Sequence, residues 1–356
     1  MSRTVSHRRR RKSAGFLRGA LILLFLAISV FAGYHCLFRA PSQSDRPVQN
    51  TPELTPEEEA LRSHLERKPD FYTILVSGVD DDNGGSDTNI LVAVDAANDS
   101  IYGVSIPRDT KAIINGDAHK INYAYNAGGT ALMADTISEQ LGIPVDYTVQ
   151  VDLQGFVALV DAIGGVTFDV PIDMDYEDPY QDLYIHIPKG VQTLDGDTAM
   201  KVVRFRSGYA SQDIGRMQTQ QAFLKAAAKQ TLTPANLGKV DDFVKIFQSY
   251  VETDLTLGNL AWLGKEAISM GSDAISFSTL PCEWKSPYIY LNQDETLSLI
   301  NQYLNPYVED RVPEDLNMTL AAVYAKPLLE QTHKGAAAAC CRIARRIQGY
   351  PTPIFL

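Results

Sequence analysis

The sequence predicts an α/β fold, an α/β/α sandwich with a central mixed β-sheet, preceded by one N-terminal transmembrane helix. Short β-rich runs alternate with segments of helical spacing, and several runs are apolar on both faces, as buried strands are. An uncharged apolar stretch also spans residues 19–38, directly behind a basic cluster. With 356 residues, 45% of them hydrophobic and 21% charged, the chain is long enough for one large domain or two modest ones.

The strands and helices follow from local patterns and their terminal residues. A helix over 131–141 is expected to end at Gly142, and a helix over 153–163 is expected to end at Gly164-Gly165. The predicted strands are 71–76, 89–95, 101–106, 146–151 and 274–280, and the further predicted helices are 212–231, 234–250, 257–270 and 294–304.

The apolar stretch 19–38 is long enough to cross a bilayer once, because twenty helical residues span about 30 Å. Basic residues before it favour a cytoplasmic N-terminus and export of everything after Arg39. A cleaved signal peptide is the alternative, although the stretch is longer than a usual signal core and no clear cleavage site follows. The prediction is a single-pass protein of the cell membrane with an extracellular domain.

The exported part is strongly acidic. Eight of the 32 basic residues lie within the first 39 positions, which leaves 24 Lys and Arg against 43 Asp and Glu, a formal charge of −19. Nucleic acid is therefore not an expected partner. The four cysteines show neither zinc spacing nor a disulfide pattern.

Two acidic residues lie at predicted strand ends. Asp80 follows the first strand, and Asp87 opens the next. Mg²⁺ is suited by a site with a small number of hard oxygen ligands that leaves room for water and phosphate oxygens. Asp, Gly and Asn are also ordinary hairpin residues, so the pattern fits a plain turn equally well.

Cations gather at the predicted ends of strands and helices. Arg108 follows a buried strand and a proline, and Lys120 lies in a nearby loop. Arg204 and Arg206 are two apart in an apparently extended stretch, so we expect them to point the same way. A guanidinium group can donate two parallel N–H bonds to phosphate oxygens. Any one of these residues alone is also explained by a solvated charged surface.

The helix over 212–231 begins with Asp213, Arg216 and Gln220, whose spacing places them on one face. Its N-terminus favours anions through unpaired N–H groups and the helix dipole. Five cations in a strongly acidic body, Arg108, Lys120, Arg204, Arg206 and Arg216, predict a site for a diphosphate with Mg²⁺.

From about Tyr72 to Lys229 the chain resembles the LytR-CpsA-Psr family of cell-envelope proteins. The resemblance rests on an ordered set of motifs: Gly78-Val79-Asp80, Ser86-Asp87-Thr88, Ser105-Ile106-Pro107-Arg108-Asp109-Thr110, Lys120-Ile121-Asn122, Gly155-Phe156, Gly164-Gly165-Val166, Leu194-Asp195-Gly196 and Asp213-Ile214-Gly215-Arg216. Each motif is weak alone, but the ordered set is specific.

This resemblance implies a phosphotransferase that moves an anionic glycopolymer, teichoic-acid-like or capsular, from a polyprenyl-pyrophosphate carrier to peptidoglycan. It implies Mg²⁺ or Mn²⁺ on Asp80 and Asp87, and Asp213 as the base that activates the acceptor hydroxyl. The implied pyrophosphate ligands are Arg108, Lys120, Arg204, Arg206, Arg216 and Gln220. Hydrolysis of the same lipid pyrophosphate, or non-catalytic binding by a regulatory envelope protein, are the alternatives.

The expected organisation is a basic cytoplasmic tail (1–18), the transmembrane helix (19–38), an extracellular stalk (39–70), the catalytic domain (71–308, with its motifs within 72–229) and a C-terminal tail without assigned role (309–356). The chain departs from the family pattern at two positions. Gly85 and Thr219 stand where many relatives carry an arginine, which implies one phosphate contact fewer or a different donor.

Overall fold

The computed structural model describes residues 38–43, 65–79, 85–179, 183–205, 207–209, 213–233 and 240–318. Of the predicted membrane segment 19–38, only Phe38 is among them, so the segment lies outside the described residues. Asp80 and Arg206 also lie outside the described residues, and so does the part of the tail from residue 319 onward. In the described ranges, no helix combines the length and the apolarity that a membrane crossing requires.

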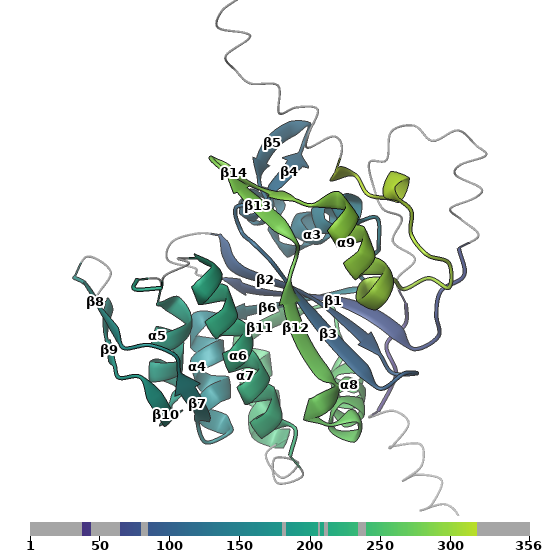
Figure 1. Cartoon of the computed structure of the whole chain (residues 1–356). Coiled ribbons are helices and arrows are strands. Elements are labelled where there is room, and N and C mark those ends of the chain that lie inside the picture. The colour runs from purple at the N-terminus through teal and green to yellow at the C-terminus, as the bar shows by residue number, and fades with distance from the viewer. Residues whose placement is uncertain are drawn as a thin grey trace, which may run out of the picture.

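A six-stranded sheet lies at the centre, in the order β11-β6-β1-β2-β3-β12 (Figure 1). Its strands are β1 (Phe71–Val79), β2 (Ser86–Asp95), β3 (Ser100–Ile106), β6 (Tyr147–Asp152), β11 (Val251–Thr253) and β12 (Ile275–Thr279). The pairs β1–β2, β2–β3 and β6–β11 are antiparallel, whereas β1–β6 and β3–β12 are parallel. The predicted mixed sheet is therefore confirmed.

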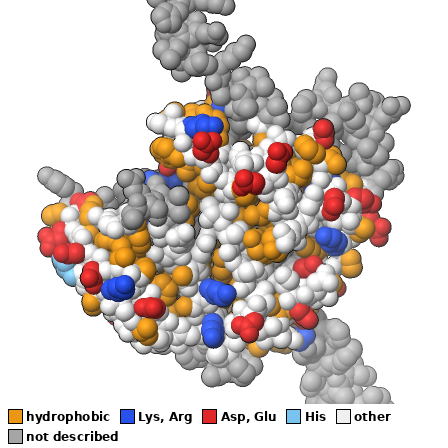
Figure 2. All heavy atoms as spheres, in the orientation of Figure 1, with side chains coloured by type: hydrophobic (Ala, Val, Ile, Leu, Met, Phe, Trp, Pro, Cys, Tyr) orange, Lys and Arg blue, Asp and Glu red, His pale blue; other side chains and the backbone are white. Residues whose placement is uncertain are grey.

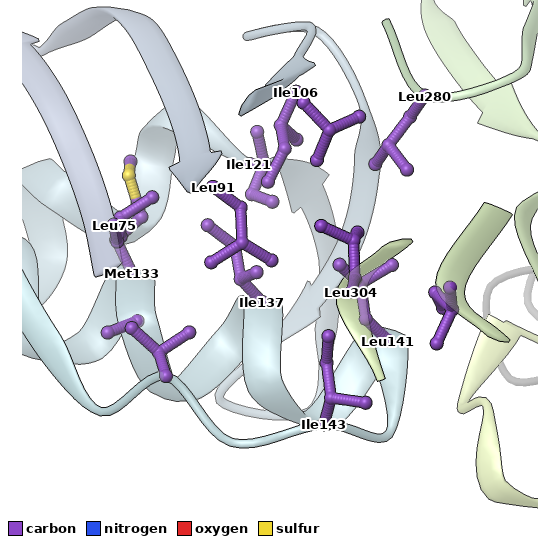
Figure 3. Close-up of a cluster of buried hydrophobic side chains, with 14 of the residues drawn as sticks. Leu75, Leu91, Ile106, Ile121, Met133, Ile137, Leu141, Ile143, Leu280 and Leu304 are labelled. Carbon is purple, nitrogen blue, oxygen red and sulfur yellow. The ribbon is translucent and has the colours of Figure 1, made fainter. Parts of the chain in front are cut away.

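Successive side chains of these strands point to opposite faces, and each face carries its own core. On one face, Leu75 and Leu91 pack with Ile137 of helix α3 (Asn122–Leu141) (Figure 3). Helix α9 (Gln293–Leu299) and the π-helix Ile300–Leu304 cover the same face. On the other face, Ile74 and Val94 pack with helix α8 (Leu257–Met270).

A second group of elements lies beside the sheet and has a separate core centred on Phe223, which is fully buried. Its helices are α4 (Leu153–Ala162), α5 (Gly196–Arg204), α6 (Asp213–Thr231) and α7 (Val240–Tyr250). Its strands form two antiparallel pairs, β7 (Val166–Val170) with β10 (Gly190–Leu194) and β8 (Met174–Asp178) with β9 (Leu183–Ile187). The β8–β9 pair projects from the body of the molecule (Figure 1).

Two further hairpins lie above the sheet in Figure 1. They are β4 (Lys111–Ile114) with β5 (Asp117–Lys120), and β13 (Cys282–Lys285) with β14 (Tyr288–Leu291). Tyr288 Oη donates to the carbonyl of Ala118 at 3.1 Å, which joins the two hairpins. The buried Lys111 ammonium lies 5.8 and 5.3 Å from the ring centroids of Tyr288 and Tyr290, and burial lowers the Lys111 pKa.

Three details differ from the sequence prediction. Helix α3 begins at Asn122, nine residues before the predicted start, and is interrupted by non-helical backbone at Gly128 and Gly129 before it ends at Gly142. Arg204 is the last residue of helix α5 and not part of an extended stretch. The prediction that Arg204 and Arg206 point the same way along an extended stretch is therefore wrong. The predicted helix 234–250 is described from Val240.

Residues from both ends of the predicted stalk contact the domain. Gln43 Nε2 donates to the carbonyls of Lys68 at 2.6 Å and Phe71 at 3.1 Å. Asn259 Nδ2, in the first turn of α8, donates to the carbonyl of Arg39 at 3.0 Å. Beyond residue 308, Leu316 and Met318 are buried in the same core as α3.

Candidate anion-binding site

A shallow pocket, open to solvent, lies where β2 begins, β3 ends and α6 begins. Its walls come from four segments far apart in sequence: Asp87, Thr88 and Asn89; Ser105, Ile106, Pro107, Arg108 and Asp109; Arg216, Met217 and Gln220; and Ile289. Four residues predicted from sequence, Asp87, Arg108, Arg216 and Gln220, thus line one pocket.

The register of the β2–β3 ladder explains why Asp87 and Arg108 meet. Asn89 pairs with Ile106, so the residues two positions beyond, Asp87 and Arg108, lie opposite each other where the ladder ends. Arg108 Nη1 lies 2.5 Å from Asp87 Oδ1, and both side chains are partly exposed, at 30% and 50%. Such an ion pair at the pocket mouth is accessible to an incoming anion or cation.

Asp109 lies between the two cations of this edge. Its Oδ1 accepts from Lys120 Nζ at 2.8 Å, and its Oδ2 lies 4.0 Å from Arg108 Nε. Lys120 ends β5 and is not among the pocket-lining residues. The structure therefore places Lys120 behind Asp109, where it supports the edge of the pocket.

Helix α6 contributes the deeper wall. Arg216 and Gln220 are four residues apart on its first turns, and Arg216 is 9% exposed. Gln220 Nε2 donates to the carbonyl of Val203 at 2.9 Å, which fixes α6 against the end of α5. Because Arg216 lies in the first turn of a long helix, the helix dipole adds to its attraction for anions.

Gly215 lets the first turn of α6 approach a tyrosine. A Cβ at Gly215 would lie 2.7 Å from the ring atoms of Tyr209, so a larger residue would displace either the helix or the ring. Burial raises the pKa of the Tyr209 phenol. Tyr209 acts as a packing support for the turn that carries Arg216.

Of the remaining predicted site residues, only the side chain of Arg204 is described. Arg204, at the end of α5, does not line the pocket. Asp80 and Arg206 lie outside the described residues, and for Asp213 the structure describes the backbone at the start of α6 but not the side chain.

The two departures from the family pattern have structural counterparts. Gly85 has a φ of +118°, a conformation that side chains rarely adopt, so an arginine there would require a different loop. Thr219 is 4% exposed, and its hydroxyl donates to the carbonyl of Gly215 at 3.0 Å within α6. Neither residue is among those that line the pocket.

Sequence reasoning missed two kinds of pocket residue. Asn89 is buried, and its side-chain oxygen accepts from Ser86 Oγ at 2.6 Å and Ser77 Oγ at 3.2 Å, which holds the β1–β2 end together. Ile289 comes from a hairpin 181 positions beyond Arg108, and its N–H donates to the carbonyl of Asp109 at 2.9 Å. No local pattern around Ile289 indicates this contact.

The pocket offers oxygen donors to a divalent cation. Among the described residues, no three His, Cys, Asp or Glu side chains are close enough to hold a metal alone. The pocket nevertheless contains two carboxylates, Asp87 and Asp109, together with the hydroxyls of Thr88 and Ser105. Mg²⁺ is commonly bound by one or two carboxylates plus substrate phosphates, so this donor set fits an ion shared with a bound phosphate.

The mixed α/β fold and this arginine-lined, carboxylate-bearing pocket define an α/β protein with a candidate anion-binding site beside the central sheet. The chain belongs to the LytR_cpsA_psr family, whose family model matches residues 40–304. The resemblance seen in the motifs is thereby confirmed.

Individual relatives agree with this assignment. The chain is 34% identical over 198 residues to the polyisoprenyl-teichoic acid–peptidoglycan teichoic acid transferase TagU of Bacillus subtilis (strain 168), covering 54% of this chain and 63% of the relative. It is 27% identical over 322 residues to TagU of Oceanobacillus iheyensis, covering 86% of this chain and 97% of that protein. The crystal structure of B. subtilis TagV superposes with a TM-score of 0.56 at 27% identity, covering 64% of this chain and 94% of that one.

Proposed function

We propose that this protein is a phosphotransferase that moves a glycopolymer from a polyprenyl-pyrophosphate carrier to peptidoglycan. The observation that carries the proposal is the meeting of Arg108, Arg216, Gln220 and Asp87 in one pocket. The names of the TagU relatives support the same reaction class. The polymer belongs to the anionic, teichoic-acid-like or capsular class.

In this proposal the arginines neutralise the pyrophosphate and hold it for in-line attack. Phosphoryl transfer depends mainly on positioning and charge stabilisation, which guanidinium groups fixed at a strand end and a helix start supply. The acceptor oxygen forms a bond to the phosphorus that carries the glycan, and the bond from that phosphorus to polyprenyl phosphate breaks. Asp213, Lys120, Arg204 and Arg206 remain proposed participants, with Asp213 taking the acceptor proton.

We also propose that the site works with Mg²⁺ or Mn²⁺, held by Asp87 and Asp80. When bound, the ion would neutralise phosphate charge. Asp87 would hold the cation in place of its present partner Arg108, 2.5 Å away, and the guanidinium would then be available to the phosphate oxygens.

The deciding experiment uses the full chain with radiolabelled lipid-linked polymer and purified peptidoglycan. We expect label to become attached to peptidoglycan, to stop doing so on chelation of divalent ions, and to resume with Mg²⁺. Release of soluble polymer without attachment would instead identify a hydrolase. Binding of the lipid without either reaction would identify a non-catalytic envelope protein.

We further propose that residues 19–38 cross the membrane once and that the domain 71–308 lies outside the cell, with residues 39–70 between them. The uncharged apolar stretch and the basic residues before it support this topology. We expect protease added to intact cells lacking their wall to digest the domain. Protection of the domain until the cells are lysed would refute this topology.

A further inference from the structure

We infer that Gln221 is a positioning residue that holds the two walls of the pocket at a fixed distance, and that this distance makes the pocket prefer a diphosphate to a monophosphate. The inference rests on the proposed function and concerns how the same pocket distinguishes its donor from its lipid product. Gln221 is not among the residues that line the pocket. Its side chain ties the helix that carries Arg216 to the strand that leads to Arg108.

The pocket lies between two separately packed parts of the molecule. Arg216 belongs to α6, which packs through Phe223 in the core of the second group of elements. Arg108 follows β3, whose Val104 and Ile106 belong to the core of the central sheet. The second group forms the left-hand part of the molecule in Figure 2, beside the sheet. The distance between the two arginines therefore depends on how α6 is held against the sheet.

Gln221 makes this connection next to the pocket. Its Nε2 donates to Thr279 Oγ1 at 2.7 Å and to Ser105 Oγ at 3.4 Å. Thr279 and Ser105 pair with each other at the end of the parallel β3–β12 ladder, and Ser105 lines the pocket. Arg108 is three residues beyond Ser105. Arg216 is five residues before Gln221, about 7.5 Å along the helix axis. The tie therefore lies close to both arginines.

The neighbouring glutamine points a different way. Successive residues of a helix are rotated by about 100°, so Gln220 and Gln221 contact different neighbours. Gln220 donates to the carbonyl of Val203 in α5, within its own group of elements, whereas Gln221 reaches across to the sheet. The first bond fixes α6 to its own core, and the second fixes α6 to the edge of the sheet beside the pocket.

Two fixed walls favour a ligand that contacts both. A diphosphate carries two phosphate groups, so one can bind Arg108 while the other binds Arg216, whereas a monophosphate offers a single group. Because the tie holds the walls in place before binding, the ligand does not have to order them, and affinity rises for the ligand that uses both walls. In the proposed reaction the donor is a diphosphate and the lipid product is a monophosphate. The same tie therefore favours binding of the donor and release of the product.

The test measures, by calorimetry, the binding of geranyl pyrophosphate and of geranyl phosphate to the full chain in nanodiscs with Mg²⁺. Gln221→Met keeps the length of the side chain and removes its N–H donors. We expect it to weaken binding of geranyl pyrophosphate by roughly five- to tenfold, the range of one hydrogen bond, and to leave geranyl phosphate within about twofold. Thr279→Val, which removes the acceptor hydroxyl, should have the same effect, and the two changes together should weaken binding no more than either alone.

The matched control is Gln230→Met, which alters another glutamine of α6. Gln230 Nε2 donates to the carbonyl of Thr167 at 3.2 Å, inside the second group of elements, so its loss should change binding of each ligand by less than about twofold. A second arm places Gln221→Met in an Arg216→Ala background. Because Gln221 acts by positioning Arg216, we expect no further loss of pyrophosphate binding there, whereas a general structural role would lower binding in both backgrounds.

Equal weakening of both ligands by Gln221→Met, or weakening of neither, would overturn the inference and leave the proposed function intact. The same holds for a normal affinity of Thr279→Val for geranyl pyrophosphate, or for equal affinity of the unaltered protein for the two ligands. Should Gln221→Met fail to fold, Thr279→Val alone decides the question. If the unaltered protein binds neither ligand, the pyrophosphate pocket itself is refuted, and the positioning role with it.

Discussion

Transfer of polymer to peptidoglycan is expected to fall by about 10²- to 10³-fold when Arg216 is replaced by alanine. Arg216 lines the pocket from the first turn of α6 and is 9% exposed, so its charge acts in a site with little competing water. The Arg216→Ala change removes the paired N–H donors of the guanidinium group, and water does not replace them. The measurement is kcat/KM for transfer, taken with the full chain and lipid-linked polymer.

Two variants make the Arg216 result interpretable. Arg216→Lys retains the charge but loses the paired N–H donors, and we expect a loss of roughly tenfold. Lys225→Ala removes an exposed cation from the same helix and should leave kcat/KM within about twofold. Near-normal transfer by Arg216→Ala, at an unchanged unfolding midpoint, would remove Arg216 from the site and favour a non-catalytic role.

Replacing Asp146 with alanine is expected to lower the free energy of unfolding by about 3–5 kcal/mol. The Asp146 carboxylate is buried, accepts from Thr73 N–H at 2.9 Å, and holds Arg67 Nη2 at 2.9 Å. The alanine variant leaves the guanidinium of Arg67, 17% exposed, without this counter-charge. Denaturant unfolding is followed by the fluorescence of Trp262, which packs edge-on against Tyr72 at 5.7 Å.

The comparison for Asp146 is Asp242→Ala, which breaks an exposed ion pair of 3.4 Å with Lys245 and should cost less than about 1 kcal/mol. A similar small cost for Asp146→Ala would mean that Thr73 and Arg67 find other partners, and that the ion pair contributes little to the β1–β6 junction.

The central sheet was predictable because its strands carry strong local signals. Leu75, Leu91 and Val104 belong to runs that are apolar on both faces, and those runs form the sheet core. Asp87 and Arg108 were also predictable as site residues, since strand-end charges converge wherever neighbouring strands pair. In these cases local sequence determines the three-dimensional position.

The sequence predictions failed where local signals for structure competed with each other or did not exist. Gly128-Gly129 resembles a helix stop, but the structure places the two glycines in a kink within α3. Asp195 caps α5 by accepting from Thr198 N–H, and the helix that it starts continues to Arg204, where the sequence predicts an extended stretch. Ile289 reaches the pocket only because β12 pairs with β3, a long-range pairing that no short segment indicates.

In the proposed topology, the contacts of residues 38–43 with the domain would set the height of the pocket above the membrane. The carbonyl of Arg39, one residue past the proposed membrane segment, accepts a hydrogen bond from α8, and the side chain of Gln43 donates one to the start of β1. In the proposed topology, almost no unattached residues would therefore separate the bilayer from the domain. The pocket adjoins the opposite end of β1, seven residues and roughly 23 Å further along the strand. If the proposed topology holds and the domain stands upright, the pocket arginines would lie above the headgroup layer. The phosphate of the proposed donor would then have to rise out of the bilayer, or the domain would have to tilt, before the two meet.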